Sequence, residues 1–116
     1  MKSPFPKTTY AQNSEVYKIL ANAKRLEILN IIKNQEVRVE DLIRIVGISK
    51  ANMSQHLSLL RRAGLVSVRR QGLYAYYKIL DPRIVEPCRI MHNLRAKKRL
   101  PILLASKGPS SIISRR

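Results

Sequence analysis

The chain has 116 residues, of which 23 are Lys or Arg and only 7 are Asp or Glu, so its formal net charge is +16. This charge is self-repulsive unless a polyanion neutralises it, and nucleic acid is the first expectation, ahead of an anionic membrane surface. The length suits one domain, and the longest apolar runs are far too short to span a bilayer. The polar start is no secretion signal. We therefore expect a cytoplasmic protein with no membrane partner.

The first part of the chain is predicted to be a flexible arm followed by helices. Residues 1–13 contain two prolines and no helical periodicity, and the folded domain is expected over residues 14–95. From Ser14 the apolar residues return at helical spacing, and Asn22 is placed to cap a second helix. The buried stripe expected for that second helix is Leu26, Ile28, Leu29 and Ile32.

Two short helices joined by a glycine turn follow, which is the sequence form of a helix-turn-helix. The first is predicted over residues 39–46 and ends at Gly47, a residue that adopts a left-handed conformation without strain. The second begins after Ser49, whose hydroxyl can cap it, and runs to about Ala63. The side chains expected to face inward are Leu42, Ile45 and Val46 in the first helix and Met53, Leu57 and Leu60 in the second.

After Gly64 the hydrophobic period changes from three or four residues to two, which predicts strands. Two such runs flank Gly72 and predict a two-stranded hairpin. A last helix follows Asp81 and Pro82, and Pro87 predicts either a kink or a start near residue 86. The predicted fold class is mainly α (α+β): a winged helix-turn-helix with a two-stranded β-wing and a C-terminal helix. Residues 96–116 are basic and are expected to form a disordered tail, with an additional phosphate-binding role left open.

The predicted partner is double-stranded DNA, contacted by the second helix of the motif and by the wing. Ser49 and Lys50 are expected at a phosphate, and His56 is expected to be a half-buried structural residue or a phosphate contact. The predicted base-reading side chains are Asn52, Ser54, Gln55 and Ser58, and Gln55 is the best of them because its amide can bond adenine with two hydrogen bonds. Arg69, Arg70 and Gln71 are expected at a minor groove.

Several short segments resemble the ArsR/SmtB family of bacterial and archaeal repressors. They are Lys24-Arg-Leu-Glu-Ile-Leu29, Ser54-Gln-His-Leu57 and Tyr76-Tyr77, and the match runs from about Val16 to Leu94. The resemblance implies a homodimer in which the first and last helices pair, and repression by occupancy of an operator. A dimer with one DNA-contacting helix in each subunit predicts a pseudo-palindromic operator. The expected dimer-interface residues are Val16, Ile19, Ile84, Cys88 and Met91.

The sensing sites known in this family are not evident in the chain. Metal-sensing members carry Glu-Leu-Cys-Val-Cys-Asp-Leu at the start of the third helix, and here Arg38 and Glu40 replace the two cysteines. A guanidinium cannot ligate a metal. Cys88 and His92 lie four residues apart, so two copies could supply four ligands at the dimer interface, but a lone cysteine on an apolar stripe is more often packed. An intersubunit disulfide of Cys88 is the redox alternative. We expect no cofactor.

Two other classes of protein compete with a repressor. A winged-helix module that binds proteins would bind DNA only weakly and without sequence preference. An enzyme is not expected, because the chain has no glycine-rich phosphate loop and its only imidazoles are His56 and His92.

Overall fold

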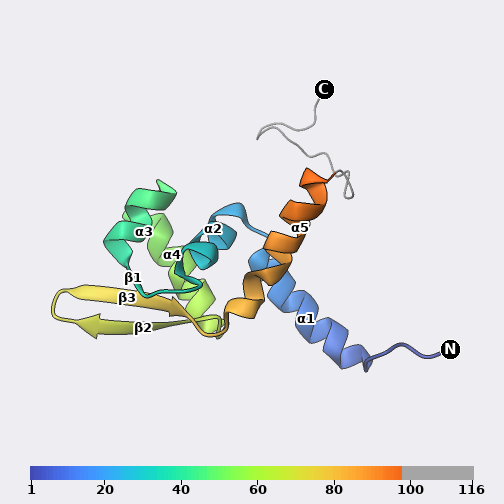
Figure 1. The fold of residues 1–116 in the computed structure, drawn as a ribbon. Coiled ribbons are helices and arrows are strands. Elements are labelled where there is room, and N and C mark those ends of the chain that lie inside the picture. The colour runs from blue at the N-terminus through green and yellow to red at the C-terminus, as the bar shows by residue number, and fades with distance from the viewer. Residues whose placement is uncertain (98–116) are drawn as a thin grey trace. The chain divides into compact units, whose positions relative to one another are not determined.

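A computed structural model describes residues 1–97 of the chain (Figure 1). Its elements are α1 (Lys7–Leu20), α2 (Ala23–Ile32), β1 (Val37–Arg38), α3 (Val39–Val46), α4 (Lys50–Arg62), β2 (Val66–Gln71), β3 (Tyr74–Ile79), a 3-10 helix (Pro82–Val85) and α5 (Glu86–Ala96). Helices 3 and 4, followed by a hairpin, form the predicted winged helix-turn-helix. Of the predicted basic tail, residues 96–116, Ala96 ends α5 and Lys97 follows it, and residues 98–116 lie outside the described residues.

The first helix begins earlier than the sequence pattern predicted. It starts at Lys7, directly after Pro6, whereas the pattern placed residues 1–13 in an arm and the helix start at Ser14. Residues 7–13 contain neither proline nor glycine, so nothing prevents them from being helical, but they bury no side chain and so show no apolar periodicity. The arm before the helix is therefore residues 1–6.

The core lies between α2, α3, α4 and one face of the sheet. Its fully buried large side chains are Ile28, Leu29, Ile32, Leu42, Met53 and Leu60. The predicted inward residues of α4 are all buried, and in α2 only Leu26 of the predicted stripe is partly exposed. The prediction for Ile45 was wrong, because its side chain is 48% exposed. α3 has only eight residues; Leu42 and Val46 are its buried residues, and Val39 and Ile43 pack beside them at the edge of the core.

The turn between α3 and α4 has the predicted chemistry. Gly47 ends α3 in the left-handed conformation, with φ of 75°, and its N–H donates to the Ile43 carbonyl. The Ser49 hydroxyl then accepts from the backbone N–H of Asn52 at 3.0 Å, which satisfies one of the unpaired N–H groups at the start of α4. These two residues fix where α4 begins.

The sheet has three antiparallel strands in the order β1-β3-β2, not the two that the sequence predicted. The additional strand is only two residues long, too short to show an alternating pattern, and it pairs Val37 with Tyr77 and Arg38 with Tyr76. β1 therefore connects the start of α3 to β3, the central strand of the sheet. The predicted glycine of the hairpin turn is present, since Gly72 has φ of 60°.

The chain after β3 begins with a 3-10 helix in which Val85 is buried in the core. α5 starts at Glu86 with Pro87 in its first turn, as one of the two alternatives for this proline predicted. Residues 1–85 form one unit, and α5 belongs to a second that begins at Glu86. None of the described helices is long and apolar enough to cross a membrane.

Candidate nucleic-acid interface

The outer face of α4 carries the side chains predicted to read bases. Asn52, Ser54 and Gln55 are exposed, and Ser58 is half-buried and accepts from the Arg62 guanidinium at 3.2 Å. Ser54, Gln55 and Ser58 also line a shallow hollow of about 460 Å³ along the helix. The inner face of α4 is buried, so this row of hydroxyl and amide groups is the part of the helix that a major groove can receive.

The start of α4 combines a positive charge with unpaired backbone N–H groups. Lys50 is exposed, and the hydroxyl of Ser49 keeps its proton for donation while its oxygen caps the helix. A phosphate at this position would meet both the lysine and the helix N-terminus.

His56 faces another helix instead of the outer surface of α4. It is half-buried, and its Nδ1 lies 3.4 Å from the Arg25 guanidinium of α2. Partial burial, with a smaller contribution from the positive charge of Arg25, lowers the pKa of His56 below its usual value. Of its two predicted roles, the structural one matches this position.

The two wing arginines have different surroundings. Arg69 donates to both carboxylate oxygens of Glu36, with the closest contact at 3.0 Å, and its guanidinium lies 4.6 Å from the centre of the Tyr76 ring. It also donates to the Gln71 amide oxygen at 2.6 Å. The hydrogen bond from Arg69 lowers the pKa of Glu36. The side chain of Arg70 is exposed and makes no hydrogen bond or ion pair with any described residue.

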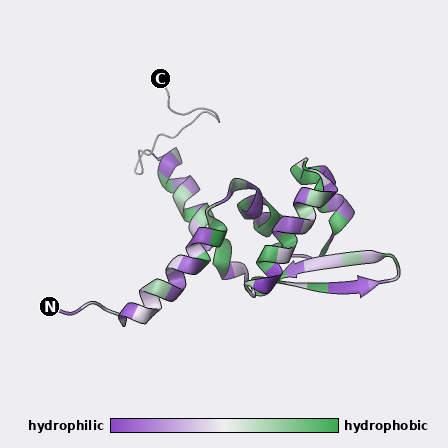
Figure 2. Ribbon diagram, turned by 180° about the vertical axis from the view of Figure 1, so that it is seen from behind, coloured by the Kyte–Doolittle hydropathy of each residue, from purple (hydrophilic) through white to green (hydrophobic). Residues whose placement is uncertain are grey.

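The wing therefore offers Arg70 to a ligand, while Arg69 is already engaged by Glu36. The end of β2 nearest the turn is hydrophilic (Figure 2). Beyond it, Leu73 projects at the tip with 97% of its surface exposed, and sequence reasoning did not single it out. The contacts of Arg69 with Glu36 and Tyr76 were missed as well.

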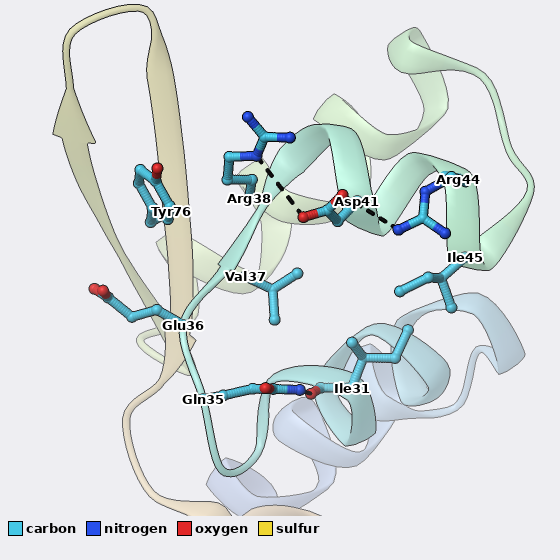
Figure 3. Close-up of a pocket in the computed structure, with 9 residues that line it drawn as sticks. All are labelled: Ile31, Gln35, Glu36, Val37, Arg38, Asp41, Arg44, Ile45 and Tyr76. Atoms are coloured by element: carbon cyan, nitrogen blue, oxygen red, sulfur yellow. Dashed lines mark hydrogen bonds and ion pairs between the residues drawn. The ribbon is translucent and has the colours of Figure 1, made fainter.

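A second hollow, of about 500 Å³, lies between the end of α2, β1 and α3 (Figure 3). Ile31, Val37 and Ile45 supply its apolar lining, which accounts for the outward position of Ile45. Arg38, at one of the two positions where metal-sensing relatives carry a thiol, lies 3.7 Å from Asp41, and its guanidinium lies over the Tyr74 ring. Among the described residues there is no group of three or more His, Cys, Asp or Glu side chains that could hold a metal ion.

The residues predicted for a dimer interface differ in how far they are buried. Val16, Ile19 and Ile84 are half-buried against the protomer's own core. On α5, Cys88 is half-buried and Met91 is 44% exposed, while His92 is exposed. Other large apolar side chains on the same two helices are exposed: Tyr10 and Tyr17 on α1 and Ile90 on α5.

Residues 22–68, from the cap of α2 to the middle of β2, match the family model for "Bacterial regulatory protein, arsR family". The chain is 35% identical over 89 residues to Rv0081 of Mycobacterium tuberculosis, described as an uncharacterized HTH-type transcriptional regulator; the match covers 76% of this chain and 78% of that protein. It is 32% identical to the transcriptional activator HlyU of Vibrio cholerae, over 66% of this chain and 71% of HlyU.

Solved structures show the same architecture. The homodimeric winged helix-turn-helix DNA-binding domain of Mb0332 from Mycobacterium bovis, a possible ArsR-family regulator, matches with a TM-score of 0.68 and 27% identity. That match covers 83% of this chain and 94% of the domain. The crystal structure of Rv0081 matches with a TM-score of 0.66 and 33% identity, over 83% and 93% of the two chains.

The lowered pKa of His56 makes stability depend on pH. As pH falls below about 6.5, the unfolded chain takes up a proton at this residue before the folded chain does, so the free energy of unfolding decreases. Urea unfolding at pH 7.5 and 5.5 is expected to show this decrease in the wild type and a smaller one in His56→Gln. His92→Gln, which removes the other histidine, serves as the control. An equal pH dependence in wild type and His56→Gln would contradict the assignment.

The two wing arginines should differ in their salt dependence of DNA binding. Arg70→Ala is expected to reduce the slope of log affinity against log salt by about 0.9, the value for one phosphate contact. Arg69→Ala should change the slope less, because Glu36 already neutralises Arg69. In a Glu36→Gln background the effect of Arg69→Ala should increase. Equal changes for both single variants in the wild-type background would show that the Glu36 pair does not withhold Arg69 from DNA.

Proposed function

Because the chain belongs to the arsR family of bacterial regulatory proteins, and is thus a DNA-binding transcriptional regulator and not an enzyme, we propose that it acts as a homodimeric repressor. The observation that carries the proposal is the division of α4 into two faces. Met53, Leu57 and Leu60 are buried, and the opposite face presents exposed amide and hydroxyl groups beside a capped, lysine-bearing N-terminus.

Exposed apolar surface supports the proposed dimer. Tyr10 and Tyr17 on α1 lie seven residues apart and so share one side of the helix, and both are exposed. α5 buries none of its residues, and Ile90 and Met91 are each more than 40% exposed. Burial of such side chains against a second copy would remove apolar surface from water. The homodimeric domain of Mb0332 supports the same assembly.

A two-fold dimer of this fold would present two copies of α4 to successive major grooves. The proposed operator is therefore pseudo-palindromic, with half-site centres about one helical turn, roughly 34–36 Å, apart. Each wing would lie against the flanking minor groove with Arg70 closest to the backbone. The site of action is the cytoplasm, where the chromosome of a bacterial or archaeal cell lies.

We propose no cofactor for this repressor. Arg38 and Glu40 stand where thiolates would bind a soft metal, and the cation of Arg38 repels one. Cys88 and His92 on α5 would reach the four ligands of a tetrahedral site only by pairing with a second copy, and the half-buried position of Cys88 instead fits a packing role.

The name of HlyU makes activation the competing outcome. Occupancy of an operator that overlaps a promoter blocks polymerase, whereas an upstream operator permits activation. Transcription in vitro from a promoter carrying the selected operator would distinguish them: less transcript on adding the protein supports repression, and more transcript contradicts it.

Selection of bound sequences from random DNA at stated salt tests the proposed function. We expect a two-fold-related consensus, whereas a module that binds proteins would enrich no sequence. On that consensus, Gln55→Ala should lose about 1–3 kcal/mol of binding free energy, because a two-hydrogen-bond contact to a base is removed. Binding to scrambled DNA should change little. Gln35→Ala, outside α4, is the matched control, and an equal loss on both DNAs would remove the base-reading role of Gln55.

A further inference from the structure

One arginine of α2 links this helix to α1 and α4. Arg25 lies in the first turn of α2, and its backbone N–H donates to the Asn22 side chain that caps this helix, at 3.0 Å. Its guanidinium Nε donates to the Ile19 carbonyl of α1 at 2.6 Å. A second guanidinium nitrogen lies 3.4 Å from Nδ1 of His56 on α4. The side chain is half-buried, so these contacts are partly shielded from water.

Each of these contacts satisfies a group that has no other partner in its own helix. Ile19 is in the last turn of α1, where carbonyls lack an intrahelical N–H and where a cation interacts favourably with the helix dipole. The contact to His56 also bears on its tautomer. A guanidinium only donates, so a hydrogen bond from Arg25 requires Nδ1 to accept and the ring proton to sit on Nε2.

His56 occupies a position on α4 from which it can control the reading surface. It directly follows Gln55 and lies one turn after Asn52, both predicted to contact bases. Met53, Leu57 and Leu60 hold the buried side of the helix, but apolar packing is not directional. These three residues set which face of α4 is buried, and a directional hydrogen bond at the margin of the outer face restrains the exact position of that face.

We infer that Arg25 is a positioning residue for DNA recognition, which fixes α4 relative to α1 through His56 without touching DNA itself. The inference rests on the proposed function, since it assumes that α4 reads bases and that α1 belongs to the dimer surface. Through the Arg25–His56 pair, dimerisation would affect base recognition. A shift of the end of α1 would be transmitted to the outer face of α4, which carries Asn52 and Gln55.

Arginine is required at this position because of its shape. Its planar group carries several N–H donors, so it can reach the Ile19 carbonyl and the His56 ring together, whereas the single ammonium of lysine cannot. Arg25→Lys keeps the charge and the buried apolar core. The fold should persist, while the reading face loses its fixed orientation.

The test compares affinity for the selected operator and for scrambled DNA. Arg25→Lys is expected to weaken operator binding about ten-fold, the size of an impaired base contact, and to leave scrambled DNA within about two-fold of wild type. His56→Ala should have a similar effect, and His56→Gln, whose amide oxygen can still accept from Arg25, should recover most of it. The double variant Arg25→Lys/His56→Ala should bind no more weakly than the poorer single variant. Arg44→Lys, on the exposed side of α3, is the matched control.

Additive losses in the double variant, or equal losses on both DNAs, would overturn the inference. Circular dichroism and urea unfolding establish that each variant is folded. If Arg25→Lys does not fold, the ¹⁵N shifts of His56 in the wild-type protein decide the matter: a proton on Nε2 with Nδ1 as acceptor supports the contact, and a proton on Nδ1 overturns it. That spectrum needs no operator, so it separates failure of this inference from failure of the selection experiment.

Discussion

The DNA-reading half of this protein depends on the burial of one side of α4. Met53, Leu57 and Leu60 are almost completely removed from water, and their helical spacing means that only one rotation of α4 buries all three. The opposite face is then necessarily outward. Each residue advances the helix by about 100°, so the start of α4 matters as much as its packing. The Gly47 turn and the Ser49 cap fix that start, and together they make the orientation of Gln55 a consequence of the core.

Charge is distributed over this scaffold unevenly. The net charge of +16 draws the whole chain toward a polyanion, but individual cations have different roles. Arg69 pairs with Glu36 and Tyr76, and Arg25 joins three helices. The main role of both arginines is therefore to hold elements of the protein in position. Arg70 and Lys50 remain exposed for contact with phosphates. The basic residues that define the reading surface are therefore fewer than composition indicates.

The sequence predicted the parts that rest on periodicity and on local turn chemistry. Both helices of the motif, the caps at Asn22 and Ser49 and the glycine turns follow from spacing and residue type alone. Contacts between distant segments were not predicted, because β1 has only two residues and the Glu36–Arg69 pair joins positions 33 residues apart. The contact between Arg69 and Tyr76 could have been predicted, because a two-residue turn at Gly72 places these residues opposite each other in the hairpin. The first half of α1 was missed since a helix that buries nothing shows no apolar stripe.

Two copies of α4, oriented by their buried faces, are proposed to read one operator together. A hydroxyl-radical footprint on the selected DNA tests this proposal most directly, because it records where the backbone is covered on each strand. We expect two protected blocks related by two-fold symmetry and about one helical turn apart, on one side of the duplex, with weaker protection where each wing lies in the flanking minor groove. A single block without symmetry, or protection spread evenly along the DNA, would contradict it.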